Sequence, residues 1–191
     1  MYLLVLPVLL GIAAVPLRGG DLSALTDLRF RKVWLLQAAL VAQVVVLGLM
    51  DGPVTVRHHA IHLGSYALAG AFVLANRSVR FFGVLSTGGG LNVAAIVANG
   101  GVMPARPGAM VSAGMRHAAD QFANSNVVEG AQLWFLGDVF AIPATWPFSN
   151  VFSIGDVVLV FGAIALVHRL CCRRTPRCVR TAPATNRLAV A

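Results

Sequence analysis

The chain has 191 residues, of which 58% are hydrophobic and only 12% are charged. Because soluble domains carry about 25% charged residues, this composition excludes an ordinary water-soluble globule. The formal net charge is +8, but the basic residues stand at the ends of long apolar runs, where they set membrane topology. The sequence therefore predicts a multi-pass protein of the cell membrane, surrounded by lipid and with no nucleic-acid partner.

Five apolar runs are long enough to form membrane-spanning helices. The first run lacks the basic segment that precedes the apolar core of a cleaved signal peptide, so we interpret it as a retained span. Turn signals such as Asp51-Gly52-Pro53 separate the runs. The predicted spans are Met1–Leu17, Val33–Met50, Ala60–Ala75, Phe81–Ala98 and Val151–Val167.

The basic residues predict the orientation of these spans, because cytoplasmic segments hold an excess of Lys and Arg. Residues 18–32, 77–80 and 169–187 hold twelve of the fifteen basic residues, and the alternate segments hold three. This bias places the N-terminus outside and the C-terminus in the cytoplasm. It divides the chain into a membrane domain, residues 1–167, and a basic cytoplasmic tail, residues 168–191, whose composition predicts disorder.

Residues 99–150 are predicted to form a folded outer region. Its segment Val127–Ile142 is apolar but holds three polar residues, and a full crossing would force the basic tail outside the cell. We therefore interpret it as a re-entrant or interfacial helix. Gly108–Ala123 has the amphipathic spacing of a helix on the membrane surface, or of one that covers the bundle. The predicted fold class is all-α: a polytopic helical membrane bundle with about five spans.

The fourth span has two different faces. Gly88, Asn92 and Asn99 lie on one side of the helix, because steps of four and seven residues return to nearly the same angle. The opposite side is a ridge of small residues that predicts close packing with another helix. The ridge residues are Ser86, Gly90, Ala94 and Ala98. Asn92 is either a ligand-binding amide or a hydrogen-bonding contact between helices.

The span ends at Asn99-Gly100-Gly101, three residues before Pro104. Asn and Gly tolerate left-handed backbone and Pro cannot continue a helix, so this sequence predicts a tight exit. Exposed amides at such a helix end can also coordinate a polar group, which makes these three residues candidates for a binding site.

Asp138 and Asp156 are the acids deepest in apolar sequence. An acid at membrane depth costs about 2.5–3.5 kcal/mol on insertion scales, so each is a candidate functional residue. For Asp156 there is a structural alternative, because Ser153-Ile154-Gly155-Asp156 has the spacing of a helix capping box. Asp138 has no such alternative and is the stronger candidate.

Histidines do not predict a metal site here. His58 and His62 share a helix face, but the segment lacks the acid of a strong metal-binding motif. Neither a metal nor a cofactor is therefore expected.

Several of these motifs are shared with a known family. The chain resembles a family of small bacterial multi-pass membrane proteins that is defined only as a domain of unknown function. The shared motifs are Arg18-Gly19-Gly20, Gly90-Leu91-Asn92, Asn99-Gly100-Gly101-Val102-Met103-Pro104, Leu136-Gly137-Asp138 and Ser153-Ile154-Gly155-Asp156. The resemblance covers residues 1–167 and implies a membrane bundle, but no activity.

The leading hypothesis is a non-enzymatic membrane protein whose outer pocket binds a small polar ligand or a lipid headgroup. The predicted binding residues are Asn92, Asn99, Gly100, Gly101, Asp138 and Asp156. One alternative is a membrane enzyme that uses Asp138 and Asp156 as acid and base. Another is a structural subunit that assembles with a membrane protein partner or with copies of itself.

Overall fold

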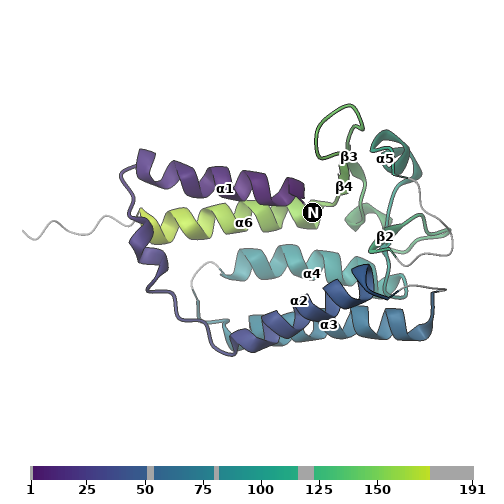
Figure 1. The fold of residues 1–191 in the computed structure, drawn as a ribbon, viewed down its shortest axis with the longest axis horizontal. Coiled ribbons are helices and arrows are strands. Elements are labelled where there is room, and N and C mark those ends of the chain that lie inside the picture. The colour runs from purple at the N-terminus through teal and green to yellow at the C-terminus, as the bar shows by residue number, and fades with distance from the viewer. Residues whose placement is uncertain (1, 51–53, 80–81, 116–122, 173–191) are drawn as a thin grey trace, which may run out of the picture.

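The computed structural model describes residues 2–50, 54–79, 82–115 and 123–172. Within them the chain is mostly helical, with six α-helices and four short strands. Five long helices lie side by side along the long axis, and the strands gather with the short helix α5 at one end (Figure 1). The long helices are α1 (Tyr2–Leu17), α2 (Val33–Gly48), α3 (Val56–Ala75), α4 (Phe82–Ala98) and α6 (Ile154–Cys171).

Each long helix coincides with a predicted span, so the helices themselves are confirmed. Helix α3 begins at Val56, earlier than predicted, because Thr55 and His58 form a capping box at its first turn. In the described part of the chain, α6 is the helix that is both long and apolar enough to cross a membrane. Helices α2 and α4, and residues 5–17 of α1, are apolar but shorter. The crossing of a bilayer stays a prediction for all five long helices, α3 and α6 included.

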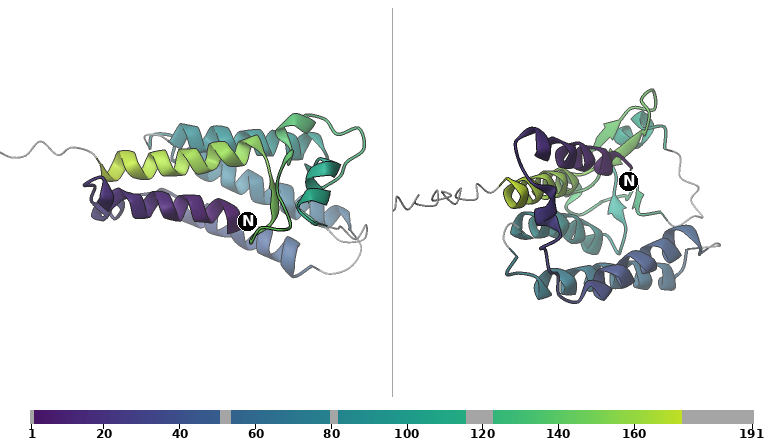
Figure 2. Two further views of the ribbon diagram at one scale, coloured as in Figure 1. Left: turned by 90° about the horizontal axis from the view of Figure 1, so that it is seen from above. Right: turned by 60° about the vertical axis from the view of Figure 1, so that its left-hand side comes forward.

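The helices pack in pairs. Helix α4 packs against α6, α2 against α3, and α1 against α6, and Figure 2 shows α1 and α6 side by side. The contact between α4 and α6 is close at Gly88, where an added Cβ would lie 2.7 Å from the carbonyl oxygen of Gly155. A side chain at this position would therefore push the two helices apart.

The prediction about the faces of α4 is wrong in one respect. The close contact uses Gly88, on the face that carries Asn92, whereas Gly90 and Ala94 of the predicted ridge are exposed. Both faces hold small residues, so the four-residue spacing alone could not choose between them. The choice follows from Asn92, whose amide bonds a carboxylate on α6.

The outer region contains short strands that the all-α prediction missed. Strand β1 (Met103–Pro104) pairs in parallel with β2 (Ser125–Asn126), and β3 (Phe140–Ile142) pairs antiparallel with β4 (Asn150–Phe152). Helix α5 (Pro107–Ser112) packs against β3 and β4. Buried side chains of this region form a small core of their own around Met110 and Val151.

Both predicted helices of the outer region require correction. Residues 127–142 form turns, the short 3₁₀ helix η2 (Trp134–Leu136) and strand β3, not a re-entrant or interfacial helix. Left-handed backbone at Gly130 and Leu133 prevents a continuous helix there. The predicted surface helix at 108–123 is reduced to α5, since Gly114 also has left-handed backbone. Residues 116–122 of that prediction lie outside the described residues.

The opposite end of the bundle carries the connection between α1 and α2. The 3₁₀ helix η1 (Leu22–Leu25) lies there, and the backbone amide of Asp21 donates to the carbonyl of Cys171. Helix α6 thus extends four residues beyond the predicted domain boundary at 167. The first residues of the predicted disordered tail, 168–171, are therefore helical, whereas its residues 173–191 lie outside the described residues.

Candidate functional site

A cavity of about 340 Å³ lies at the end of the bundle that carries the strands. Helices α2, α3, α4 and α6 line it together with the outer region. Its polar lining residues are Gln43, Tyr66, Asn92, Asn124, Ser125, Asp138, Asn150 and Asp156. The structure therefore brings Asn92, Asp138 and Asp156 to one cavity, although 64 positions separate the first from the last.

Asn92, Ser153 and Asp156 form a hydrogen-bonded group between α4 and α6, called here the interhelical cluster. The amide nitrogen of Asn92 donates to Oδ1 of Asp156 over 2.7 Å, and its oxygen accepts from the Ser153 hydroxyl over 2.8 Å. Ser153 and Asp156 also form the predicted capping box of α6, with reciprocal bonds of 3.0 Å. Asp156 is thus a cap and a cavity wall at once.

Gly155 makes room for this cluster. A Cβ on Gly155 would overlap the side-chain oxygen of Asn92 and would lie 2.8 Å from the carbonyl oxygen of Gly88. The glycine before Asp156 is therefore required by the close approach of α4, and not by an unusual backbone angle. The Gly-Asp motif thus has a geometric reason in this structure.

Asp138 comes from the outer region and is only 4% exposed. Its backbone is fixed by two bonds, one from its amide to the Pro104 carbonyl (2.9 Å) and one to its carbonyl from the amide of Arg106 (3.1 Å). Gly137 packs directly against the same Pro104 carbonyl, leaving no space for a Cβ. The second Gly-Asp motif therefore also marks a close contact, here between two segments of the outer region.

Among the described residues, one donor bonds the carboxylate of Asp138: the Ser125 hydroxyl, which donates to Oδ2 over 2.6 Å. Burial raises the pKa of Asp138 from its usual 3.8 to about 6. The bond from Ser125 lowers this pKa and the negative charge of Asp156 raises it, but both effects are smaller than that of burial. Asp138 is therefore poised to change charge near neutral pH.

The structure places Asn99, Gly100 and Gly101 outside the cavity lining. They make the predicted tight exit from α4, with Gly100 and Gly101 both in left-handed backbone. The Asn99 side chain exchanges two hydrogen bonds with the backbone of Gln132, of 2.7 and 2.9 Å, and so ties the outer region to the end of α4. The carbonyl of Gly101 meets Nδ1 of His62 at 2.8 Å.

Several lining residues were missed by sequence reasoning. Gln43 and Tyr66 are polar groups inside predicted spans, and such groups are a signal that could have identified them. Ser125 and Asn124 belong to a short polar stretch, Asn124-Ser125-Asn126, that carries no recognisable motif. Only the fold brings this stretch beside Asp138.

The described residues contain no group of side chains suited to hold a metal ion. Within residues 2–50, 54–79, 82–115 and 123–172, no three His, Cys, Asp or Glu side chains gather as a metal site would require. Of the candidate histidines, His58 accepts at the first turn of α3 and His62 contacts the Gly101 carbonyl. His58 also contacts the Thr55 hydroxyl, and the His62 ring packs edge-on against Tyr66, so both histidines have roles in packing and capping.

A comparison with family models tests the resemblance to a family of unknown function. Residues 27–168 match the model of DUF5317, a family of unknown function. The chain belongs to DUF5317. The predicted membership in a family of unknown function is thereby confirmed, with the first shared motif, Arg18-Gly19-Gly20, outside the matched residues. Neither curated proteins nor solved structures gave a match to this DUF5317 chain.

Proposed function

We propose that this DUF5317 protein is an integral membrane protein whose outward-facing cavity binds a small polar molecule without transforming it. The observation that carries the proposal is the shared cavity of Asn92, Asp138 and Asp156. Its volume of about 340 Å³ falls in the range of roughly 300–1,000 Å³ that is typical of small-molecule sites. Convergent polar groups in an otherwise apolar wall are also typical of such sites.

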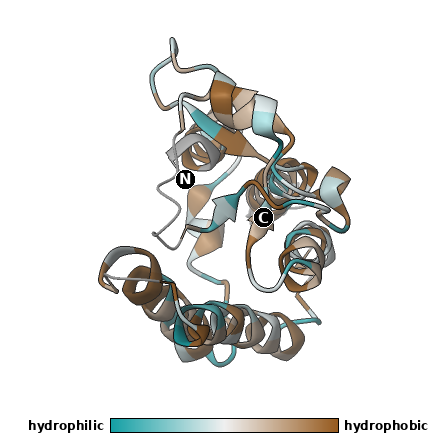
Figure 3. Ribbon diagram, turned by 90° about the vertical axis from the view of Figure 1, so that its right-hand side faces the viewer, coloured by the Kyte–Doolittle hydropathy of each residue, from teal (hydrophilic) through white to brown (hydrophobic). Residues whose placement is uncertain are grey.

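The surface of the helices supports membrane insertion. Large apolar side chains are exposed along three different helices, with Leu10 of α1 62%, Val44 of α2 62% and Phe161 of α6 71% exposed. Viewed from the outer end, the helices are largely hydrophobic (Figure 3). Soluble proteins rarely leave such continuous apolar faces in water, whereas lipid-facing helices do.

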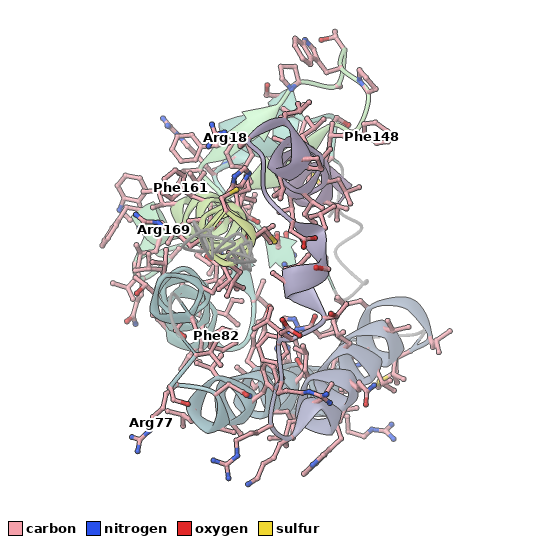
Figure 4. All side chains as sticks on the ribbon, turned by 90° about the vertical axis from the view of Figure 1, so that its left-hand side faces the viewer. Arg18, Arg77, Phe82, Phe148, Phe161 and Arg169 are labelled. Atoms are coloured by element: carbon pink, nitrogen blue, oxygen red, sulfur yellow. The ribbon has the colours of Figure 1, made fainter. Side chains whose placement is uncertain are left out.

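The charge distribution supports the proposed orientation. Arg18 directly follows α1, Arg77 follows α3 and Arg169 belongs to the last turn of α6, and these three helix ends lie at the same end of the bundle in Figure 1. Figure 4 shows the three arginines when this end faces the viewer. This end is opposite the cavity, as expected if it faces the cytoplasm. Exposed aromatic side chains at the cavity end, including Trp134 and Trp146, are typical of residues at the outer membrane–water interface.

Binding is favoured over catalysis by the state of the two acids. Both carboxylate oxygens of Asp156 accept hydrogen bonds, from Asn92 and from the Ser153 backbone, so this group is fixed as a cap. An acid–base pair needs two groups that can exchange protons with a substrate. The raised pKa of Asp138 favours the enzyme alternative for that residue, but not for its partner.

The test is mass spectrometry of the protein extracted in native lipid, comparing the wild type with Asp138→Asn and with Asp27→Asn. Asp27 is exposed and belongs to the connection at the far end, so its variant matches the charge change without touching the cavity. We expect a small molecule to copurify with the wild type and with Asp27→Asn, and to be depleted from Asp138→Asn. A preparation with no bound small molecule, but with a stoichiometric protein partner, would instead support the structural-subunit alternative.

Reporter fusions test the proposed orientation separately. A fusion after residue 105 should report the outside and one after residue 185 the cytoplasm. A cytoplasmic signal from the first fusion would contradict the proposed topology.

A further inference from the structure

The charge of the cavity restricts what it can hold. Among the described residues that line it there are two carboxylates, Asp138 and Asp156, and no Arg, Lys or His. The remaining polar groups of the lining are amides and hydroxyls, which adapt to either charge. Against these described groups, an anionic ligand would add a third negative charge without a compensating positive group, whereas the charge of a cation would be neutralised.

The carboxylate of Asp138 has an unused acceptor. Ser125 bonds one oxygen, Oδ2, and among the described residues no donor bonds the other, Oδ1. Asp138 is only 4% exposed, and it still belongs to the cavity lining. A buried carboxylate in this state either keeps a proton or needs a further donor, and a positively charged donor stabilises it most, because burial penalises an uncompensated charge.

The other walls indicate the kind of cation. Ile96, Met103 and Met115 present apolar side chains to the cavity, and Tyr66 presents an aromatic ring. An aromatic face attracts an ammonium or guanidinium group, and apolar walls suit the carbon body of an organic molecule. A bare metal ion would gain little from these groups, and the described residues hold no cluster of three metal-binding side chains.

We infer that the cavity binds a small organic cation, an ammonium or guanidinium compound, whose charge is held by Asp138 and Asp156, and that protonation of Asp138 releases it. This inference rests on the proposed function and names its ligand class. In the release step, one proton from solvent adds to the Asp138 carboxylate as the cation leaves, so the charge of the occupied and emptied cavity is the same. Acidification outside the cell would thus lower the affinity.

Other titratable groups surround Asp138. Asp156 faces the cavity from α6 and Tyr66 from α3, and the His62 ring packs edge-on against the Tyr66 ring with 5.0 Å between their centroids. The segment 116–122 next to Met115 contains Arg116, His117 and Asp120 and lies outside the described residues. The pKa of Asp138, about 6, sets the expected midpoint of release.

The experiment compares three probes of similar size and different charge: butylammonium, butyrate and butyramide. Each is titrated into the full-length protein in a nonionic detergent at constant ionic strength, and binding is followed by calorimetry and by the unfolding midpoint. At pH 7.5, we expect saturable binding of butylammonium and none of the other two. At pH 5.0 its dissociation constant should rise about tenfold, because a pKa of about 6 leaves roughly one molecule in ten ionised.

Two variants test whether Asp138 is the residue that holds the cation. Asp138→Asn should lose both the affinity for butylammonium and its pH dependence, whereas Asp27→Asn should keep both. If Asp138→Asn does not fold, the pH dependence of the wild type still decides. The inference is wrong if butyrate or butyramide binds as well as butylammonium, if none of the three binds, or if affinity is equal at the two pH values. The proposed function fails only if native-lipid mass spectrometry also finds no bound molecule.

Discussion

Replacement of Asp138 by Asn should stabilise the protein at alkaline pH, although Asp138 is buried and hydrogen bonded. Asn has nearly the same shape, and its carbonyl oxygen can accept the Ser125 hydroxyl in place of carboxylate Oδ2. The new amide group would occupy the position of Oδ1 at the cavity. The substitution therefore removes a buried negative charge with little change in packing.

The magnitude follows from the pKa. In the folded protein the Asp138 pKa is about 6, against 3.8 for an ordinary Asp, so ionisation favours the unfolded chain. A difference of about two in pKa corresponds to about 3 kcal/mol. The pKa of Asp138 is higher in the folded protein than in the unfolded chain. Protonated Asp138 therefore favours folding of the wild type most below pH 4, and this stabilisation of the folded state is lost as the pH rises through 6. At pH 8 the variant should exceed the wild type by up to about 3 kcal/mol.

The assay is thermal unfolding of both proteins in detergent without added ligand, at pH 5 and pH 8. At about 2–4 °C per kcal/mol, a difference of about 3 kcal/mol places the midpoint of Asp138→Asn about 6–12 °C above that of the wild type at pH 8, and the gap should shrink at pH 5. A variant that is less stable than the wild type at both pH values would refute the reasoning. Asp138 would then be a structural acid whose charge the fold requires.

Three further predictions concern the packing and the surface. Gly155→Ala should destabilise the protein by about 1–3 kcal/mol in thermal unfolding, because its methyl group would displace the interhelical cluster. The control Gly90→Ala, with open space around it, should be neutral or slightly stabilising. Asn99→Ala should speed hydrogen exchange around Gln132 about fivefold to tenfold, since a hydrogen bond contributes about 1 kcal/mol; unchanged exchange would argue against this tie. With the other two tryptophans replaced by Phe, Trp146 should be quenched by lipids brominated near the headgroup, and emission like that of a water-exposed indole would contradict the proposed interface position.

The sequence was sufficient to predict the five long helices and the cap of α6. The apolar runs are long, and turn signals mark their ends. The Ser153–Asp156 capping box, read from a spacing of three residues, is present with both of its bonds. For Asp156 the sequence left two roles open, a helix cap and a binding-site residue. The structure assigns both positions to it, because Asp156 caps α6 and also lines the cavity.

The outer region was harder to predict because its strands are only two or three residues long. Such strands leave no alternating pattern in the sequence. The apolar segment 127–142, with its scattered polar residues, was therefore predicted to be a helix. The partner of Asp138 was also hidden, since Ser125 precedes it by thirteen residues and no motif connects them. For Asn99, both proposed roles fitted the sequence, and the structure shows its amide engaged by the Gln132 backbone.

The cavity touches both members of the α2–α3 pair and both members of the α4–α6 pair. Any occupant would therefore contact two packed units at once, and its loss would weaken their mutual alignment more than the helices themselves. We expect harsh detergents that wash the cavity empty to abolish the near-ultraviolet circular dichroism before the far-ultraviolet signal. Gentle extraction thus becomes a condition for obtaining homogeneous material, and not only for detecting a bound compound.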